Sequence, residues 1–569
     1  MKDSIFFKLN FILKTKYKIY LCIFVLTLII GLAFQLIGIS SIIPLTSTFF
    51  EQPTDNNFFL KIKDVFPMLE KINNFSMLLT FFVSCIILSN LIFIFSTYLS
   101  AKITFAIERD LRNTLYDYFI NNNYSFFFNT TNSKFISLMI NETQRLCTSV
   151  LLPLAEVASR TVLVLGISIF LIYLTTKETT LVILLILFFY FVYYLLIRKK
   201  IIQNNKLLTK NNEDLVKNSN DLFKSFREVK IYGIENMFFD KIINITNKIQ
   251  KIRFFTVFFS TSPRYYMEII MFLIIYIFFL LKGQNINIEK ISFLAVFIYA
   301  FFKILPSLQG LFSQFMVAKS NLDSLEVIYK KINEFKDNKQ HSEETNFKIN
   351  SEKEDFKQIK LKNISFDYDD KRILDEIELN ISKGEKIGIK GNSGSGKTTL
   401  INLIVGLLKP SSGEIYFNDN KIKPHQLINM YDNKIGIIPQ NPTMLETSIR
   451  ENILLGEKEI KEKLYKSLNI AGLNNFSEKD LNKNIHSSSL NLSGGQIQRI
   501  SIARAIYRSP NILIIDEGFN QLDNENEKRV MQNLMEIKDL TVIMVYHNIF
   551  NENLLNKIFL IENHKLKII

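Results

Sequence analysis

The chain has 569 residues, which is too long for one hydrophobic core and predicts at least two domains. Its three cysteines exclude a disulfide framework or a zinc site with the usual ligand spacing. The formal net charge is +14, but Lys and Arg concentrate between long apolar stretches, where they set membrane topology or meet anionic headgroups. We therefore expect these basic residues to face a lipid bilayer, and we expect no nucleic-acid partner.

Six apolar segments in the first half of the chain are long enough to cross a bilayer, which takes about 20 helical residues. They are 19–45, 77–100, 151–174, 179–197, 254–281 and 291–312. The first continues without a small-residue cleavage site, so we expect an uncleaved span and not a signal peptide. The pattern predicts an α-helical six-span membrane domain over residues 1–330.

The segments between the spans alternate in length and charge. Segments 101–150 and 198–253 are long and rich in Lys and Arg, whereas 175–178 and 282–290 are short. By the positive-inside rule the long segments and both termini are cytosolic. Segment 58–66, after the first span, mixes apolar and charged positions, which suits either an amphipathic helix on the outer leaflet or a solvent loop.

Charged residues inside the predicted spans suggest a water-lined cavity, because a charge at membrane depth costs a few kcal/mol. Glu156 and Arg160 stand four residues apart, and we favour a structural ion pair over a functional role for them. Arg264 and Lys303 have no such partner assigned, so we predict that these two cations line a cavity for an anionic headgroup. The neighbours of Arg264, Tyr265 and Tyr266, suit either this cavity or helix packing.

A charged stretch with almost no apolar periodicity, residues 331–357, predicts a linker to a second domain at residues 358–569. That domain contains a complete G-x-x-x-x-G-K-[ST] loop between an apolar β-like run and a helical start at Thr399. Its glycines let backbone N–H groups surround phosphate oxygens, while Lys397 neutralises charge and Thr398 can hold Mg²⁺. The loop consists of Gly391, Asn392, Ser393, Gly394, Ser395, Gly396, Lys397 and Thr398.

Further motifs follow this loop in a fixed order. Leu492-Ser493-Gly494-Gly495-Gln496 resembles the ABC signature, and the apolar run 512–515 before Asp516-Glu517 resembles the Walker B strand. Together they identify the second half as an α/β P-loop ATPase domain similar to the ABC ATPase family. The resemblance also implies an adenine-stacking aromatic residue, a Q-loop, a D-loop and a switch histidine, at Tyr368, Gln440, Asp523 and His547 respectively.

The resemblance to ABC ATPases assigns roles to these residues. Glu517 polarises the attacking water, His547 contacts the γ-phosphate, and Lys397 and Gln440 complete the catalytic group. Mg²⁺ is held by Thr398, Gln440 and Asp516. The ATP contacts are Tyr368, the loop from Gly391 to Thr398, Thr399, and the signature residues Ser493, Gly494, Gly495 and Gln496.

In ABC dimers the signature of one subunit caps the ATP bound by the other, so the resemblance implies a second subunit. The simplest partner is an identical copy, which makes the expected assembly a homodimer. The alternating membrane half resembles type IV ABC exporters, whose coupling helices seat on the ATPase. By that resemblance the coupling contacts lie at 126–129 and 221–227.

Residues 38–45 and 262–268 resemble the PglK-type flippases, which move polyprenyl-diphosphate-linked oligosaccharides across the bacterial inner membrane. That resemblance implies a basic cavity for the pyrophosphate and a lipid contact at segment 58–66. One departure is present: most exporters continue Walker B as D-E-A-T-S-A-L-D, whereas residues 516–523 read D-E-G-F-N-Q-L-D. The carboxylates remain, so we expect hydrolysis, and the effect on coupling stays open.

Three functions compete at this point. The first is a homodimeric flippase for a lipid-linked oligosaccharide, and the second is an exporter of another cargo such as a lipid A-like lipid or a peptide. The third is a soluble ABC ATPase acting on DNA or ribosomes, which six apolar spans exclude. The cofactors expected in every case are ATP and Mg²⁺.

Overall fold

The computed structural model describes residues 5–49, 74–120, 122, 124, 132–174, 177–282, 288–343, 355–368, 371–423, 427, 434–485, 492–546 and 552–569. The predicted segments 58–66 and 126–129 and the predicted switch residue His547 lie outside these residues. The chain divides into two compact units, Met1–Asn121 with Thr131–Asn346, and Asn122–Thr130 with Phe347–Ile569.

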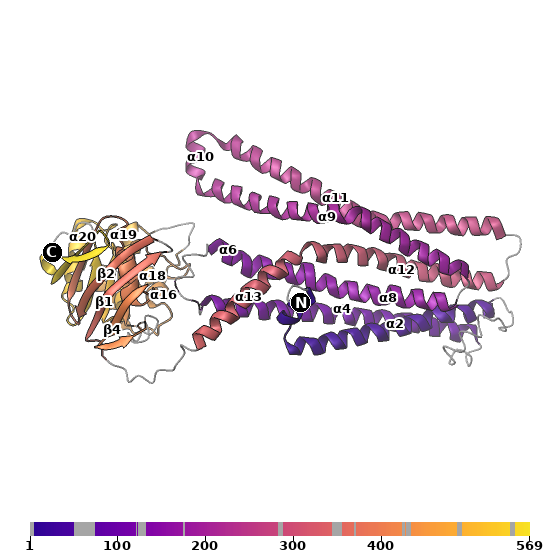
Figure 1. Cartoon of the computed structure of the whole chain (residues 1–569), viewed down its shortest axis with the longest axis horizontal. Coiled ribbons are helices and arrows are strands. Elements are labelled where there is room, and N and C mark those ends of the chain that lie inside the picture. Colours follow the sequence, from indigo (N-terminus) through magenta and orange to yellow (C-terminus); the bar gives the residue numbers. More distant parts are fainter. Residues whose placement is uncertain are drawn as a thin grey trace. The chain divides into compact units, whose positions relative to one another are not determined.

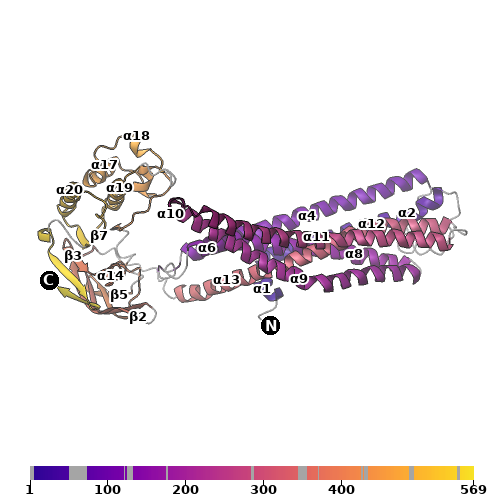
Figure 2. The same cartoon turned by 90° about the horizontal axis from the view of Figure 1, so that it is seen from above.

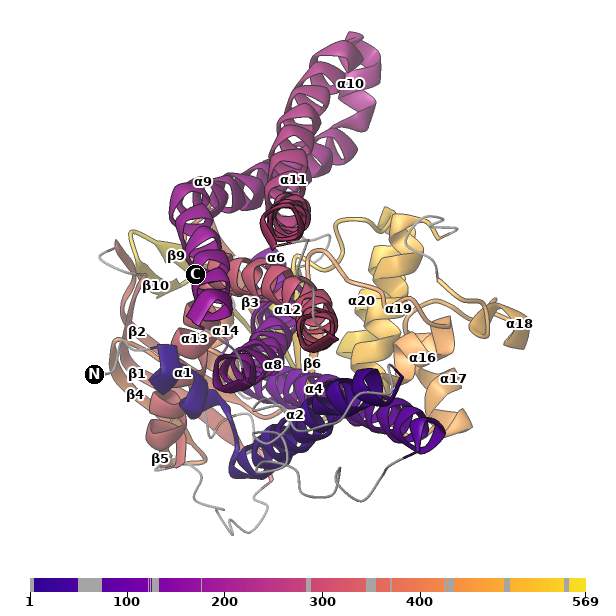
Figure 3. The same ribbon diagram turned by 90° about the vertical axis from the view of Figure 1, so that its right-hand side faces the viewer.

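The first unit is all-helical in its described part. Its elements are α1 (Ile5–Ile12), α2 (Thr15–Phe49), α4 (Phe75–Ile120), α6 (Asn132–Ser137), η2 (Leu138–Glu142), α7 (Thr143–Leu146), η3 (Cys147–Leu151), α8 (Leu152–Leu174), α9 (Lys177–Lys224), α10 (Phe226–Tyr232), α11 (Glu235–Lys282), α12 (Ile288–Ser320) and α13 (Leu322–Glu343). Figure 1 shows α9 and α11 side by side, joined through α10, and Figure 3 shows this pair leading away from α2, α4, α8 and α12.

Four stretches of these helices are long and apolar enough to cross a membrane within the described residues. They are Thr15–Thr46, Phe75–Ile120, Phe135–Tyr173 and Ala295–Ser320; they contain the predicted first and second spans and most of the predicted third and sixth spans. The predicted fourth and fifth spans lie on α9 and α11, where several side chains are outside the described part, so the count of six stays a prediction. Helices α4, α9 and α11 run well beyond the predicted spans, into the segments expected in the cytosol.

Helix α9 contacts α11 at a proline inside α11. Pro263 has no N–H, so the carbonyl of Phe259, four residues earlier, lacks its intrahelical donor. The Tyr193 hydroxyl of α9 donates to this carbonyl at 2.9 Å and lies 3.1 Å from the Ser262 hydroxyl. A neighbouring helix thus satisfies the backbone group that the proline leaves without a partner, as helices in bilayers require.

Replacing Tyr193 with Phe is expected to loosen α11 around Pro263, because the Phe259 carbonyl loses its donor. Intramembrane hydrogen bonds contribute about 1 kcal/mol, so amide exchange across residues 259–264 should become about fivefold faster. Hydrogen–deuterium exchange of the full chain measures this change. The control is Tyr266→Phe, since Tyr266 is exposed on the same helix; equal exchange in both variants would contradict the role of the Tyr193 hydroxyl.

Helix α10 and the end of α9 contain the predicted coupling segment 221–227. Helix α9 ends at Lys224, Ser225 forms a break, and α10 ends at Gly233, whose φ of +65° is the left-handed conformation that glycine adopts without strain. Phe223 and Phe226 are 76% and 51% exposed at this turn. Part of the predicted linker, residues 331–343, belongs to helix α13.

The second unit consists of two sheets with helices. Its elements are β1 (Gln358–Tyr368), β2 (Lys371–Ser382), β3 (Lys386–Gly391), α14 (Lys397–Val405), β4 (Ser412–Phe417), β5 (Asn420–Ile422), β6 (Ile435–Ile438), α16 (Ile449–Leu454), α17 (Lys461–Ile470), α18 (Glu478–Leu481), α19 (Gly494–Tyr507), β7 (Ile512–Asp516), α20 (Asn524–Met535), β8 (Thr541–Val545), η4 (Glu552–Leu554), β9 (Lys557–Glu562) and β10 (Lys565–Ile568). In Figure 2, α17, α18 and α19 gather at one end of this unit and β2 and β5 at the other.

The strand order of the larger sheet brings two predicted motifs together. This sheet has the order β10-β9-β3-β8-β7-β6, with parallel pairing from β9 to β6, and the smaller sheet is antiparallel with the order β2-β1-β4-β5. Strand β7 is buried along Ile512–Ile515, as expected of a parallel strand covered on both faces. Since β3 and β7 both flank β8 and run in parallel, the phosphate loop after β3 and Asp516 at the end of β7 share one edge.

Candidate nucleotide-binding site

The phosphate loop connects β3 to α14 and depends on glycines for its conformation. Gly394 and Gly396 have φ values of +80° and +101°, which other residues rarely adopt. A Cβ atom at Gly396 would also lie 3.0 Å from side-chain atoms of Ile373 and Leu374 on β2. Lys397 is only 7% exposed, and its ammonium donates to the carbonyl oxygens of Gly391 at 2.8 Å and Asn392 at 3.0 Å, so the loop surrounds this side chain.

Two features of this loop fit an anionic ligand. Helix α14 begins at Lys397 with no side-chain cap on its first turn, and such helix N-termini favour phosphate. The buried Ser395 hydroxyl within the loop has no hydrogen-bond partner in the described part of the chain. The predicted contacts Asn392, Ser393 and Gly394 are exposed, whereas Thr399 is buried behind them.

The predicted Mg²⁺ ligands converge where β3 and β7 end. The Thr398 hydroxyl donates to Asp516 at 3.3 Å, and the Gln440 side chain donates to Glu517 Oε2 at 2.6 Å. Burial raises the pKa of the Asp516 carboxyl, and the neighbouring Glu517 charge acts in the same direction. A hydroxyl, an amide oxygen and a carboxylate are the oxygen donors that Mg²⁺ prefers, so these residues fit the ion.

The signature residues form the start of helix α19. Ser493 is the N-cap, and its side chain accepts from the N–H of Gln496 at 3.2 Å, while its own N–H donates to the Gln496 side chain at 2.9 Å. This capping box leaves Gly494 and Gly495 on the first turn of a 14-residue helix. The predicted ATP-contacting residues of the signature therefore form the N-terminus of a helix, and a helix N-terminus favours binding of a phosphate group.

The predicted adenine-stacking residue lies near the phosphate loop. Tyr368 is the last residue of β1, is 37% exposed, and pairs with Lys371 at the start of β2. The same strand β2 provides Ile373 and Leu374, which pack behind Gly396. The Tyr368 ring also contacts Phe366 edge to face, with ring centroids 4.8 Å apart.

The segment that departs from the family pattern is tightly packed. Gly518 lies against β6, where a Cβ atom would come within 2.6 Å of Ile438 Cγ2 and 3.1 Å of the Ile438 carbonyl oxygen. Phe519 is 7% exposed and belongs to the core formed around β7 and α19. At the two positions where the family pattern has alanine and threonine, Gly518 thus packs against β6 and Phe519 packs into the core.

Two residues of this segment were not among the predicted site residues. The Asn520 amide donates to Glu517 Oε2 at 3.4 Å. The N–H of Gln521 donates to Gln498 of α19 at 2.9 Å, and a Cβ atom at Gly494 would lie 2.5 Å from Gln521 Oε1. The sequence does point to these two residues, because Asn520 and Gln521 replace the serine and alanine of the usual family pattern.

The membrane unit contains the predicted cations, and one prediction about them is wrong. Arg264 is not unpaired: its Nε donates to Glu268 at 2.7 Å, an ion pair four residues apart on α11. The four-residue spacing between Arg264 and Glu268 is the helical spacing at which such pairs form. Lys303, in contrast, is partly buried on α12, and its ammonium has no ion-pair or hydrogen-bond partner among the described residues.

The predicted pair Glu156 and Arg160 is confirmed, with 3.4 Å between Arg160 Nη2 and Glu156 Oε2. Arg160 also donates to the Pro306 carbonyl at 3.3 Å, which links α8 to α12. A Cβ atom at Gly310 would fall 2.1 Å from Arg160 Nη1, so glycine makes room for the guanidinium. Arg160 of α8 thus packs against Pro306 and Gly310 of α12, the helix that also carries Lys303, and within the described part Glu156 is the only acidic side chain ion-paired to Arg160.

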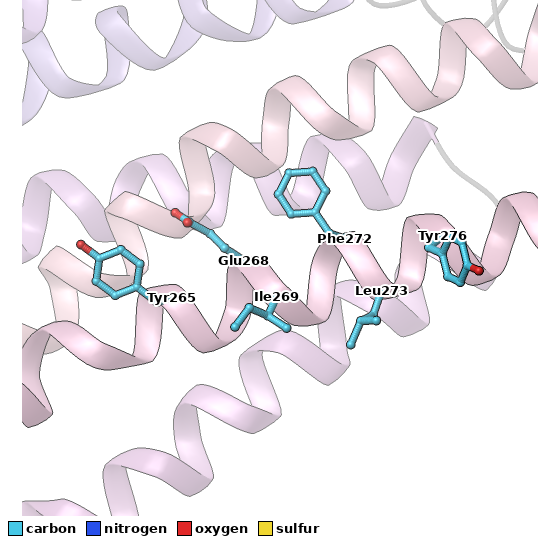
Figure 4. Close-up of a pocket in the computed structure, with 6 residues that line it drawn as sticks. All are labelled: Tyr265, Glu268, Ile269, Phe272, Leu273 and Tyr276. Atoms are coloured by element: carbon cyan, nitrogen blue, oxygen red, sulfur yellow. The ribbon is translucent and has the colours of Figure 1, made fainter.

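One face of α11 lines a cavity of about 560 Å³ (Figure 4). Its lining residues recur every three or four positions, and they are Tyr265, Glu268, Ile269, Phe272, Leu273 and Tyr276. The apolar members are more than half exposed, and Glu268 stands among them. Glu268 on this face is ion-paired with Arg264, so the face combines a charge pair with apolar side chains.

Comparison with known proteins agrees with both units. Residues 21–305 match the ABC transporter transmembrane region and residues 374–520 match the ABC transporter ATPase family. The lactococcin-A transport/processing ATP-binding protein LcnC of Lactococcus lactis is 30% identical over 297 residues, 50% of this chain and 39% of LcnC. The alpha-hemolysin translocation ATP-binding protein HlyB of Escherichia coli O157:H7 is 36% identical over 215 residues, 36% of this chain and 30% of HlyB.

These matches span between three and four tenths of the relatives' own length. The fold as a whole is similar to the structure of a bacterial Atm1-family ABC exporter with ATP bound, with a TM-score of 0.69. That similarity covers 96% of this chain and 94% of the exporter at 16% identity. The transmembrane family matches half of the sequence and the ATPase family lies in the other half, so this chain belongs to the ABC transporter family.

Proposed function

We propose that the chain binds MgATP, hydrolyses it and uses the energy to move an amphipathic cargo across a membrane. The observation that supports this most directly is the meeting of Thr398 with Asp516 and of Gln440 with Glu517 beside the phosphate loop. Glu517 polarises the attacking water, and Lys397 and His547 stabilise charge on the γ-phosphate. Mg²⁺ bound by Thr398, Gln440 and Asp516 neutralises charge on the phosphate oxygens.

The working assembly is a homodimer in the bacterial inner membrane. The α19 N-terminus at Ser493 to Gln496 caps the ATP of the partner subunit, and the exposed Phe223 and Phe226 serve as a coupling contact. The membrane domain covers residues 1–330, the linker 331–357 and the ATPase domain 358–569. The ATPase domain and both termini are cytosolic, because the long basic segments lie on that side.

The cargo that fits best is a lipid with an anionic headgroup, and more narrowly a polyprenyl-diphosphate-linked oligosaccharide. Lys303 supports this proposal: its partly buried ammonium has no partner among the described residues, and such a charge at membrane depth is costly until an anion reaches it. Arg264 shares its charge with Glu268, so Lys303 carries the larger part of the headgroup contact. The aromatic face of α11 provides apolar surface for the lipid tail.

A peptide is the second candidate cargo. The relative LcnC is a lactococcin transport/processing protein, and its similarity extends over half of this chain. The α11 face, with exposed tyrosines, phenylalanine and one carboxylate, suits an apolar peptide with a basic residue as well as a lipid tail. A transport assay with each kind of cargo is therefore needed to distinguish a lipid from a peptide.

The deciding experiment reconstitutes the full chain in liposomes and measures ATP-dependent translocation of a polyprenyl-diphosphate oligosaccharide. Movement is expected with the native chain and absent with Glu517→Gln. Lys303→Met is expected to reduce movement of the anionic lipid at least about tenfold and to keep basal ATP turnover. ATP turnover without lipid movement would reject the lipid proposal and leave a peptide as the cargo to test.

A further inference from the structure

The turn after Glu517 contains a side chain that contacts the proposed general base. Glu517 follows β7 with a φ of +50°, and the N–H of Asn520 donates back to the Glu517 carbonyl at 3.4 Å. This tight turn brings the Asn520 side-chain amide to 3.4 Å from Glu517 Oε2. Asn520 itself is exposed, so its side chain has no packing role in the core.

The two residues after Glu517 fix the backbone of this turn by packing. Gly518 lies against Ile438 of β6, and the buried Phe519 fills the core between β7 and α19. The backbone that carries Asn520 is therefore held in place by this packing. A side chain attached to an anchored turn can orient its neighbour, whereas one on a loose loop could not.

Two amides from different elements meet the same oxygen of Glu517. Gln440, after β6, donates to Oε2 at 2.6 Å, and Asn520 donates to Oε2 at 3.4 Å. The terminal torsion of a glutamate side chain is broad, so a carboxylate held by one donor still rotates. A second donor on the same oxygen restricts this rotation.

We propose that Asn520 is a positioning residue for ATP hydrolysis, which orients the Glu517 carboxylate toward the attacking water. The proposal rests on the role of Glu517 in the proposed function. Most exporters have serine at this position, and serine ends one bond earlier than asparagine, so this chain uses a longer donor. Misorientation of a general base lowers the rate of the chemical step without weakening substrate binding.

The test uses Asn520→Ala, Asn520→Ser and Asn520→Asp in the full chain reconstituted in nanodiscs. All three should lower kcat for ATP by about threefold to tenfold, with KM changed less than about twofold. Asn520→Asp should lower kcat at least as much as Asn520→Ala, because it removes the amide donor and adds a negative charge beside the Glu517 carboxylate. Asp516 and Lys397 also face this site, and both are unchanged in these variants.

The matched control is Asn524→Asp, which adds the same charge at an exposed position of α20 and should keep the native kcat. A kcat within about twofold of the native value in Asn520→Ala, or a change in KM alone, would overturn the proposal. Glu517→Gln distinguishes failure of the proposed function from failure of the Asn520 role. If the native chain does not hydrolyse ATP, the proposed function fails; if Glu517→Gln keeps more than about a tenth of the native rate, the general base is another residue and Asn520 has no positioning role. If Glu517→Gln is inactive while the Asn520 variants match the native chain, only the role of Asn520 fails.

Discussion

The Glu517→Gln variant is expected to hydrolyse ATP at least about 100-fold more slowly than the native chain while binding ATP with similar affinity. The change removes the carboxylate that accepts from Gln440 at 2.6 Å and replaces it with a group of the same size that cannot take a proton from water. The phosphate loop and Thr398 are untouched. Steady-state turnover in nanodiscs and a nucleotide-binding titration measure the two effects.

Asp516→Asn provides the comparison for this prediction. Asp516 is assigned to the metal and accepts from Thr398, so its loss should weaken Mg²⁺-dependent ATP binding as well as turnover. Glu517→Gln should therefore lower the turnover rate alone, whereas Asp516→Asn should lower both the turnover rate and the affinity for MgATP. Turnover above about a tenth of the native rate in Glu517→Gln would assign the general base to another residue.

Motifs whose function depends on local geometry were predictable from the sequence. The phosphate loop needs glycines at 394 and 396 because of their φ values, and such positions can be read from residue type alone. The Glu156–Arg160 pair is likewise a four-residue relation on one helix. The Arg264–Glu268 pair has the same spacing, so the sequence contains the information for this pair as well.

Contacts between distant segments were not predictable from spacing. Tyr193 and Phe259 are 66 residues apart, and only the pairing of α9 with α11 shows that the hydroxyl satisfies the carbonyl left by Pro263. The contact of Gly518 with Ile438 likewise depends on the pairing of β6 with β7, which spacing in the sequence does not show. Hydropathy predicted where the spans lie, but it could not predict that α4, α9 and α11 continue as helices beyond the apolar windows, because those extensions carry polar residues.

Restoring the alanine that most exporters have, by Gly518→Ala, is expected to destabilise this chain by about 1–3 kcal/mol. The added Cβ atom would lie 2.6 Å from Ile438 Cγ2, 3.1 Å from the Ile438 carbonyl oxygen and 3.1 Å from Ile515 Cγ2, so β6 must move away from β7. Amide exchange of the β6 and β7 peptides in the full chain should accelerate about fivefold to 150-fold. The clash involves backbone as well as side chain, so rotamer change alone does not relieve it.

A double-mutant cycle with Ile438→Ala tests whether this contact causes the effect. Ile438 is fully buried, so Ile438→Ala alone creates a cavity and is expected to cost about 2–5 kcal/mol. In the double variant the Gly518→Ala methyl group enters the space that Ile438 vacates, and the combined loss should be smaller than the sum by about 1 kcal/mol or more. Additive losses would mean that Gly518 is required for the backbone of the turn and not for packing against β6. Since the same turn carries Asn520, the Gly518→Ala variant should also lower kcat, and Ile438→Ala should partly restore it.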